Sequence, residues 1–257
     1  MQLGKSDLEF FNENGFIVLR DFANKKECNA ILDIANIHIK YRVEPIETEE
    51  EYHLQSKEER VHKIDYNSKM RGTIRRLRQA YNRDIVFKNW MENREIRPIL
   101  KQILNDRVAI ITAHHNSIMT KMPHSSTQTR WHQDIRYWSF SDNNLVSVWL
   151  ALGEENTQNG VLEFIPKSHK MKFNPNQFDN KDYFREDLKE NMSLIETKTS
   201  VNLSKGDVLI FHSNLLHRAN KNSTSEPKIS FVYTVKGALT KTLKNSRSSS
   251  YKEIFLD

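Results

Sequence analysis

Two histidines and one aspartate in this sequence have the types and spacing of metal ligands. His132 and Asp134 lie two residues apart in the strand-like segment WHQDIRYW, and His217 follows the strand-like segment VLIFH. Side chains two apart in a strand point to the same face. Two imidazoles and one carboxylate on one face of a metal leave its other positions open, as in non-haem Fe(II) oxygenases. The His-x-Asp pair alone could be a surface pair on an edge strand, so the surrounding residues decide.

Other histidines fit this role less well. His212 ends the strand VLIFH and is the competing distal ligand. His169 lies at a turn in PKSHK, where a surface or structural role is favoured over ligation. His114 and His115 are adjacent in a strand, so only one of them can point inward, as a pocket-lining or core residue.

The scarcity of glycine and cysteine excludes several classes of protein. The 7 glycines are widely spaced, so the chain contains no G-x-G-x-x-G, no Walker A loop and no G-x-S-x-G elbow. Dinucleotide-binding folds, P-loop NTPases and typical serine hydrolases are therefore not expected. The single cysteine, Cys28, excludes an internal disulfide and a Cys-rich metal site, and its helix-like surroundings predict a buried thiol.

The composition is that of a globular protein. The chain has 257 residues, of which 37% are hydrophobic and 10% aromatic, enough for a core. The opening MQLGKSDLEFFNENG carries acidic residues where a signal peptide needs its apolar core, and no apolar run approaches the roughly 20 residues of a membrane span. We therefore expect a cytoplasmic location in a reducing compartment.

The net charge of +6 is unevenly distributed. Between residues 60 and 78 the sequence has a cluster of basic residues: Arg60, Lys63, Lys69, Arg71, Arg75, Arg76 and Arg78. A solvated helical face is favoured here over an anion-binding surface, because charge runs usually serve solubility. A nucleic-acid binder is a further alternative, but the chain has no recognised reading motif, so no nucleic-acid partner is expected.

The elements that must position these residues change character along the chain. The first third predicts a helix ending at Gly15, a strand over 16–22, a helix opening at Asn24 or Lys25, a loop or solvated helix start over 44–59, and an amphipathic helix over 89–104 that Pro98 kinks or restarts. From about residue 109 the hydrophobic period becomes two, with Asn, Gly, Pro and Ser turn signals between short strands.

Helices followed by short antiparallel strands predict a mainly β fold with flanking helices, a double-stranded β-helix of the jelly-roll, cupin-like type. We expect one domain over residues 1–257. It comprises a mostly helical part (1–108), a jelly-roll core (109–237) and a tail (238–257).

Three segments resemble the phytanoyl-CoA dioxygenase family of Fe(II)/2-oxoglutarate-dependent oxygenases: WHQDIRYW, LVSVWLALGEENTQNGVLEFIPKSHK and GDVLIFHSNLLHRANKNSTSEPKISFVY. The N-terminal FFNENGFIVLRDFANKKECNAIL is similar to the opening of that family. The resemblance covers most of the chain apart from about residues 40–108 and the tail, and NGVLEFIPKSHK is its most specific part.

The resemblance implies that His132, Asp134 and His217 bind Fe(II), with 2-oxoglutarate and O2 as cosubstrates. Related halogenases replace the carboxylate with a small residue, so the presence of Asp134 favours hydroxylation of a C–H bond.

The resemblance also implies a cosubstrate site. Eleven positions after the distal histidine such enzymes have a basic residue, usually Arg, that pairs with the far carboxylate of 2-oxoglutarate, and this chain has Lys228 there. Lysine keeps the charge but lacks the bidentate fork, so we expect help from a hydroxyl such as that of Ser230. Ala219 lacks the hydroxyl often found two positions after the distal histidine. Trp149 resembles the aromatic wall beside the cosubstrate.

The substrate is less clearly indicated. If the basic stretch covers the mouth of the pocket, an anionic small molecule or glycolipid would fit it. WHQDIRYWSF followed by LVSVWLALG is similar to bacterial hydroxylases of Kdo, the acidic sugar of lipopolysaccharide, which would place the enzyme at the inner face of the membrane as a peripheral protein. Alternatives are a hydroxylase of another small metabolite or of an acyl-CoA, an inactive jelly-roll binding module, and a Zn(II) hydrolase. The oligomeric state is not indicated.

Overall fold

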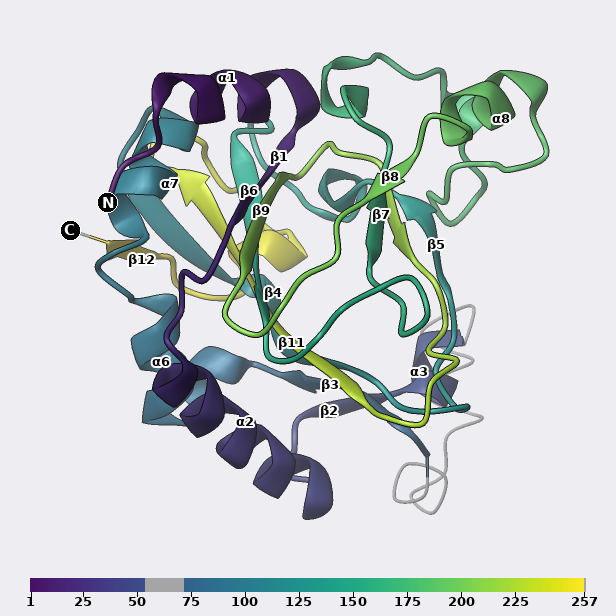
Figure 1. The fold of residues 1–257 in the computed structure, drawn as a ribbon. Coiled ribbons are helices and arrows are strands. Elements are labelled where there is room, and N and C mark those ends of the chain that lie inside the picture. Colours follow the sequence, from purple (N-terminus) through teal and green to yellow (C-terminus); the bar gives the residue numbers. More distant parts are fainter. Residues whose placement is uncertain (54–71, 257) are drawn as a thin grey trace.

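The computed structural model describes residues 1–53 and 72–256. Two antiparallel sheets face each other (Figure 1). The larger has the strand order β1 (Phe16–Leu19), β9 (Val208–His212), β6 (Leu145–Ala151), β11 (Lys228–Gly237), β4 (Val108–Lys121), β3 (Ile74–Arg78) and β2 (Ile46–Thr48), with β12 (Ile254–Leu256) also paired to β4. The smaller has the order β5 (Thr129–His132), β10 (His217–Ala219), β7 (Leu162–Phe164) and β8 (Thr199–Ser200). The predicted jelly roll with flanking helices is confirmed.

The central strands of the large sheet are buried on both faces, which explains their continuous apolar runs. In β6, Val146, Val148 and Leu150 pack in the core cluster beneath the helices. Trp149 and Ala151 point the other way and pack in the core between the two sheets. The inner face of the large sheet therefore forms one wall of the space between the sheets.

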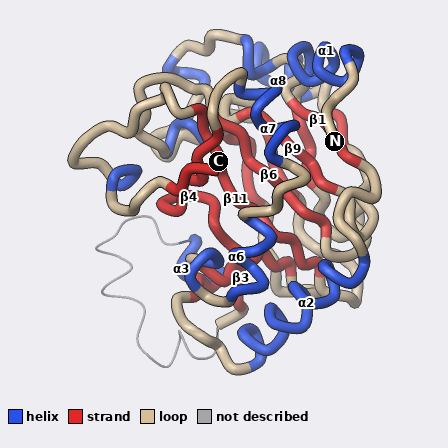
Figure 2. Tube along the Cα trace, turned by 90° about the vertical axis from the view of Figure 1, so that its left-hand side faces the viewer, coloured by secondary structure: helices blue, strands red, loops and turns tan. Residues whose placement is uncertain are grey.

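Helices cover the outer face of the large sheet (Figure 2). Asn24 caps α2, because its side chain accepts a hydrogen bond from the Glu27 amide at 2.9 Å. Pro98 lies in the first turn of α7, where proline is tolerated, so the helical segment restarts there as predicted. The covering helices are α1 (Lys5–Asn14), α2 (Lys25–Lys40), α6 (Ile85–Met91) and α7 (Arg97–Leu104).

The remaining helices are short. α3 (Glu49–His53) follows β2, and α8 (Lys189–Ile195) lies in the segment between β7 and β8. The 3-10 helices are η1 (Ala80–Asn82), η2 (Asp134–Tyr137), η3 (Ser168–Lys170), η4 (Pro175–Gln177) and η5 (Arg247–Ser249).

The basic stretch differs from its prediction. Where the structure describes it, it is the strand β3 and not a solvated helical face, and Arg75 is only 2% exposed. Ile74 and Leu77 pack in the core, and the buried Arg75 guanidinium pairs with Glu49 at 2.9 Å. The segment 44–59, predicted as a loop or a solvated helix start, contains β2, which pairs with β3, and then the short helix α3. Residues 54–71, with the other four basic residues of the stretch, lie outside the described residues.

The single cysteine, Cys28, is buried in α2, as predicted.

Within residues 1–53 and 72–256, no helix combines the length and the apolar character needed to span a membrane.

Two largely buried histidines should make the protein sensitive to acid. Burial and the Arg247 charge lower the pKa of His114 to about 3, and burial with the His169 charge lowers the pKa of His212 to about 4. In the unfolded chain both groups take up protons near pH 6.5, so the unfolded state binds more protons below that pH. The free energy of unfolding should fall from pH 6.5 toward pH 4, by up to about 1.4 kcal/mol per pH unit for each histidine.

Urea unfolding at a series of pH values measures this effect. The double variant His114→Gln/His212→Gln should show a shallower dependence on pH than the wild type. An unchanged slope would show that these two histidines do not set the acid sensitivity.

Candidate metal centre

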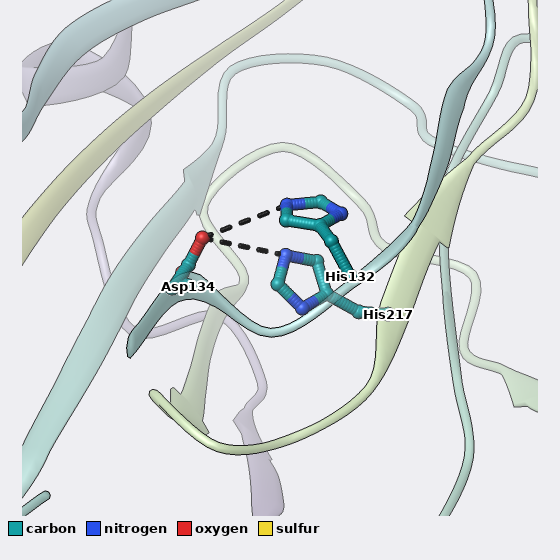
Figure 3. A group of neighbouring side chains, drawn as sticks. All are labelled: His132, Asp134 and His217. Atoms are coloured by element: carbon teal, nitrogen blue, oxygen red, sulfur yellow. Dashed lines mark ion pairs between the residues drawn. The ribbon is translucent and has the colours of Figure 1, made fainter. Parts of the chain in front are cut away.

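Strand register brings His217 opposite His132. The two residues are direct partners in the pairing of β10 with β5. The segment WHQD is not one strand, as its spacing suggested, because β5 ends at His132 and η2 begins at Asp134. The 3-10 turn nevertheless directs the Asp134 carboxylate toward both imidazoles (Figure 3).

The distances suit a shared ion. The Nε2 atoms of His132 and His217 lie 3.6 and 3.8 Å from Oδ1 of Asp134. Two donors that each lie about 2.0–2.2 Å from one divalent ion are at most about 4.4 Å apart. In the described part of the chain, these three side chains are the group whose ligand atoms all lie within 4.8 Å of one another. Two imidazoles and one carboxylate fit Fe(II).

Backbone carbonyls orient both imidazoles. Nδ1 of His132 lies 2.8 Å from the Arg130 carbonyl, and Nδ1 of His217 lies 2.9 Å from the Leu215 carbonyl. A carbonyl only accepts, so each Nδ1 carries the proton and each Nε2 presents a lone pair. Burial, together with the His132 charge, lowers the pKa of His217 to about 3. His217 is therefore neutral and able to bind a metal at neutral pH.

The Asp134 carboxylate is buried and held from both sides. Its Oδ2 accepts a hydrogen bond from the Ser147 hydroxyl at 3.2 Å, and its Oδ1 lies 3.4 Å from Nε2 of His115. Burial alone would raise the pKa of Asp134, but the neighbouring imidazoles, with His115 first, outweigh it and hold the pKa below its usual range. The carboxylate is thus ionised and suited to bind a cation.

The structure resolves the choice between His114 and His115. His115 lines the cavity beside the metal centre. His114 points away, stacks on Trp138 with ring centroids 5.0 Å apart, and lies 2.7 Å from the Ser248 hydroxyl through Nε2. Strand alternation predicted that only one could face inward, and the register of β4 selects His115.

The competing ligand His212 lies elsewhere. Its ring packs against His169 with centroids 5.3 Å apart, and its Nδ1 accepts a hydrogen bond from the Asn214 amide at 3.0 Å. The structure brings His217, and not His212, to His132 and Asp134.

Ser147 should tune the affinity for metal. The Ser147→Ala variant removes the hydroxyl that orients Asp134, and loss of such outer partners typically costs 10- to 100-fold in metal affinity. Anaerobic competition between the protein and a chelator for Fe(II) would measure it. Ser213→Ala is the matched control, because this buried hydroxyl donates to the Asn143 carbonyl instead. Equal affinity in both variants would contradict the role of Ser147.

A cavity extends from the metal centre to the residues expected at the cosubstrate. It is lined by His132, His217, Trp149 and Lys228, among others. Ser230 lies two residues after Lys228 on the same face of β11, as predicted, since both contact the same carboxylate.

That carboxylate belongs to Glu155, which the sequence did not single out. Glu155 is 1% exposed. Its Oε1 accepts from the Ser230 hydroxyl at 2.6 Å and from Trp149 Nε1 at 3.0 Å, and its Oε2 accepts from Lys228 Nζ at 3.0 Å. The signal that could have found it is Lys228, since a lysine within an apolar strand needs a partner.

The fold is a jelly roll, and two imidazoles and one carboxylate converge beside a cavity lined by cationic side chains. Together these features define a class, the non-haem iron oxygenases. Within this class, the chain belongs to the phytanoyl-CoA dioxygenase (PhyH) family, whose sequence model matches residues 11–230. It is therefore a member of a family of 2-oxoglutarate-dependent non-haem iron dioxygenases, which use Fe(II), 2-oxoglutarate and O2.

Curated relatives are distant. The human peroxisomal phytanoyl-CoA dioxygenase is 30% identical over 125 residues, which cover 44% of this chain and 36% of the relative. The match thus spans little more than a third of that protein. Ectoine dioxygenase from Halomonas elongata is 22% identical over 250 residues, covering 90% of this chain and 70% of the relative.

Solved structures share the fold. EctD from S. alaskensis with bound Fe has a TM-score of 0.77 at 18% identity and covers 99% of this chain and 87% of its own. The epimerase SnoN, in complex with Fe3+, alpha ketoglutarate and nogalamycin RO, has a TM-score of 0.73 at 15% identity and covers 93% and 85%.

Proposed function

We propose that residues 1–257 form one oxygenase domain that hydroxylates a C–H bond of an anionic substrate, with Fe(II) held by His132, Asp134 and His217. The observation that carries this proposal is the convergence of two Nε2 lone pairs and one ionised carboxylate, each oriented by a hydrogen bond on its other side. When bound, iron with 2-oxoglutarate and O2 supplies the oxidant. The chain supplies ligand orientation and a buried cavity.

The cosubstrate is proposed to lie along this cavity. Trp149 and Lys228 line it together with His132 and His217, and Ser230 shares with Lys228 the hydrogen-bonded carboxylate of Glu155. Buried cations and hydroxyls are suited to a carboxylate.

An anionic substrate is supported by charge beside the cavity. Arg76 lines the cavity and pairs with Glu47 at 3.0 Å. Burial, followed by the charges of Arg78 and Arg76, lowers the pKa of Arg247, so three arginines lie near one another. Among the described residues, Glu47 raises the pKa of Arg247 and so offsets part of this positive charge, and the remainder favours an acidic group. Within this class we propose the Kdo sugar of Kdo-lipid A, reached from the inner face of the membrane.

An anaerobic titration with Fe(II) and 2-oxoglutarate tests the reaction class. We expect a metal-to-ligand charge-transfer band in the wild type. Its absence would overturn the oxygenase assignment and favour an inactive binding module, whereas substrate turnover without O2 would indicate a Zn(II) hydrolase.

Succinate release tests the substrate class. Kdo-lipid A should stimulate O2-dependent succinate formation more than acyl-CoAs or neutral sugars do. Arg247→Gln should raise the KM for Kdo-lipid A without changing the charge-transfer band. Stimulation by acyl-CoA alone would overturn the sugar and keep the reaction class.

A further inference from the structure

Exposed leucines alternate with exposed lysines in the segment that follows β11. Leu239 is 81% exposed and Leu243 is 49% exposed, and Lys241 and Lys244 beside them are exposed as well. From residue 238 to residue 252 the sequence has four basic and no acidic residues. This pattern suits an anionic lipid surface, because the apolar groups enter the bilayer interface while the ammonium groups contact the headgroups.

Hydrogen bonds fix this segment to the body of the protein. The Leu239 amide donates to Oδ2 of Asp106 at 2.7 Å. The Leu243 amide donates to the Ser139 carbonyl at 3.0 Å. The fold therefore holds both leucines in their exposed positions, and binding to a surface does not have to order a flexible chain first.

Phe255 in β12 extends the same surface, on the side of the molecule that faces the viewer in Figure 2. Its side chain is 45% exposed, and Cζ of Arg107 lies 5.5 Å from the centroid of its ring. The Arg107 carbonyl accepts a hydrogen bond from the Ala238 amide at 2.8 Å, so Arg107 links Phe255 to the loop that carries Leu239. We call the following residues the tail patch: Leu239, Lys241, Leu243, Lys244 and Phe255.

Basic groups outnumber the carboxylates that hold the segment in place. Three carboxylates accept hydrogen bonds from it, those of Asp106, Asp142 and Glu253. The four basic residues between positions 238 and 252, together with Arg107, exceed them in number. A negatively charged surface is therefore attracted to this face.

The segment that carries the tail patch also reaches the edge of the cavity. Arg247 follows three residues after Lys244 and lies near Arg76, which lines the cavity. The next residue, Ser248, is buried, and its hydroxyl accepts a hydrogen bond from the Ser139 amide at 2.8 Å. A surface bound by the tail patch would thus lie close to the arginines proposed to receive the substrate.

We propose that the tail patch docks on an anionic lipid bilayer, with Leu239 and Leu243 inserted at the interface and Lys241 and Lys244 against the headgroups. Leucines separated by lysines lack the continuous apolar centre of a protein interface, which favours a bilayer over a protein partner. The family model ends at residue 230, before this surface begins. The inference deepens the proposed function and rests on it for the substrate, a glycolipid that the docked enzyme would reach in the bilayer.

Flotation of the full chain with lipid vesicles tests the proposal. The wild type should bind vesicles of equimolar phosphatidylglycerol and phosphatidylcholine, less at high salt, and bind phosphatidylcholine alone much more weakly. Leu239→Ser/Leu243→Ser should weaken binding by about tenfold or more. Lys241→Gln/Lys244→Gln should weaken it by about 10- to 30-fold and remove most of the salt dependence.

Two results would overturn the proposal. A leucine variant that binds like the wild type would show that charge alone attracts the protein to the vesicles. A wild type that binds no vesicles, but forms a dimer that Leu239→Ser/Leu243→Ser dissociates in analytical ultracentrifugation, would make the patch a contact between copies of the chain.

A matched control removes exposed apolar side chains elsewhere. Ile37→Ser/Ile85→Ser changes residues of α2 and α6 that are 49% and 63% exposed, and should leave vesicle binding unchanged. Equal loss in this control would contradict a specific role of the tail patch. Thermal unfolding and the charge-transfer band with Fe(II) and 2-oxoglutarate should be the same in all variants.

The docking surface and the proposed function can fail separately. If the wild type binds anionic vesicles through the tail patch but Kdo-lipid A does not stimulate succinate formation, the proposed substrate fails and the docking surface stands. If Kdo-lipid A in vesicles is a substrate and the tail variants bind those vesicles like the wild type, only the docking surface fails.

Discussion

Replacing Asp134 with alanine is expected to weaken Fe(II) binding by more than about 100-fold, since loss of an outer-shell partner alone typically costs 10- to 100-fold. The carboxylate is the negative donor of the cluster, and its Oδ1 faces the Nε2 atoms of both His132 and His217. Its removal leaves two neutral imidazoles, which cannot hold the ion as firmly. Anaerobic equilibrium dialysis with Fe(II) measures the affinity, and the charge-transfer band with 2-oxoglutarate should disappear.

The fold should survive this change. The His115 and His217 imidazoles are neutral, because burial lowers the pKa of each, and they need no counter-charge. Thermal unfolding of the metal-free variant should therefore remain cooperative. Asp187→Ala, an exposed aspartate paired with Arg185 at 2.6 Å, is the matched control and should bind Fe(II) like the wild type. An Asp134→Ala variant with wild-type affinity would show that the ion lies elsewhere.

Replacing Lys228 with methionine alone is expected to lower the free energy of unfolding by about 3–5 kcal/mol. The ammonium group lies 3.0 Å from Glu155, and both side chains are almost fully buried. Methionine preserves much of the volume, so the main cost is a buried carboxylate without its counter-ion. Urea unfolding of the metal-free protein measures the change.

The double variant Lys228→Met/Glu155→Gln isolates the cause. It also removes the Glu155 charge that the single variant leaves unpaired. The glutamine amide can still form hydrogen bonds with Ser230 and Trp149, so most of the lost stability should return. A single variant as stable as the wild type would show that Lys228 and Glu155 do not form a buried ion pair.

The cluster of His132, Asp134 and His217, our candidate metal ligands, could be predicted from the sequence because its signal is mostly local. One residue separates His132 from Asp134, and the surrounding segments carry the family pattern. The core strands could be predicted for a similar reason, since a period of two is a property of consecutive residues. Asn24 caps a helix and Pro98 lies where a helix restarts, as the local preferences of these two residue types predict.

The rest depended on which distant segments pair. From the sequence alone, the stretch containing Arg75 has the charge pattern of a solvated surface. In the fold it forms β3 of the large sheet, where Glu49 compensates the buried Arg75 guanidinium. The choice of His115 over His114 follows from the register of β4, which no local pattern specifies.

The sequence by itself determined the donor types at the metal centre, the jelly-roll class and the presence of a cation at position 228. Only the tertiary structure decided which charges are already paired. Glu155 lies in a polar turn of the sequence, yet folding buries it against Lys228. The physical reason is that burial and pairing of a charge depend on side chains from other strands, whose proximity is set by register and not by position along the chain.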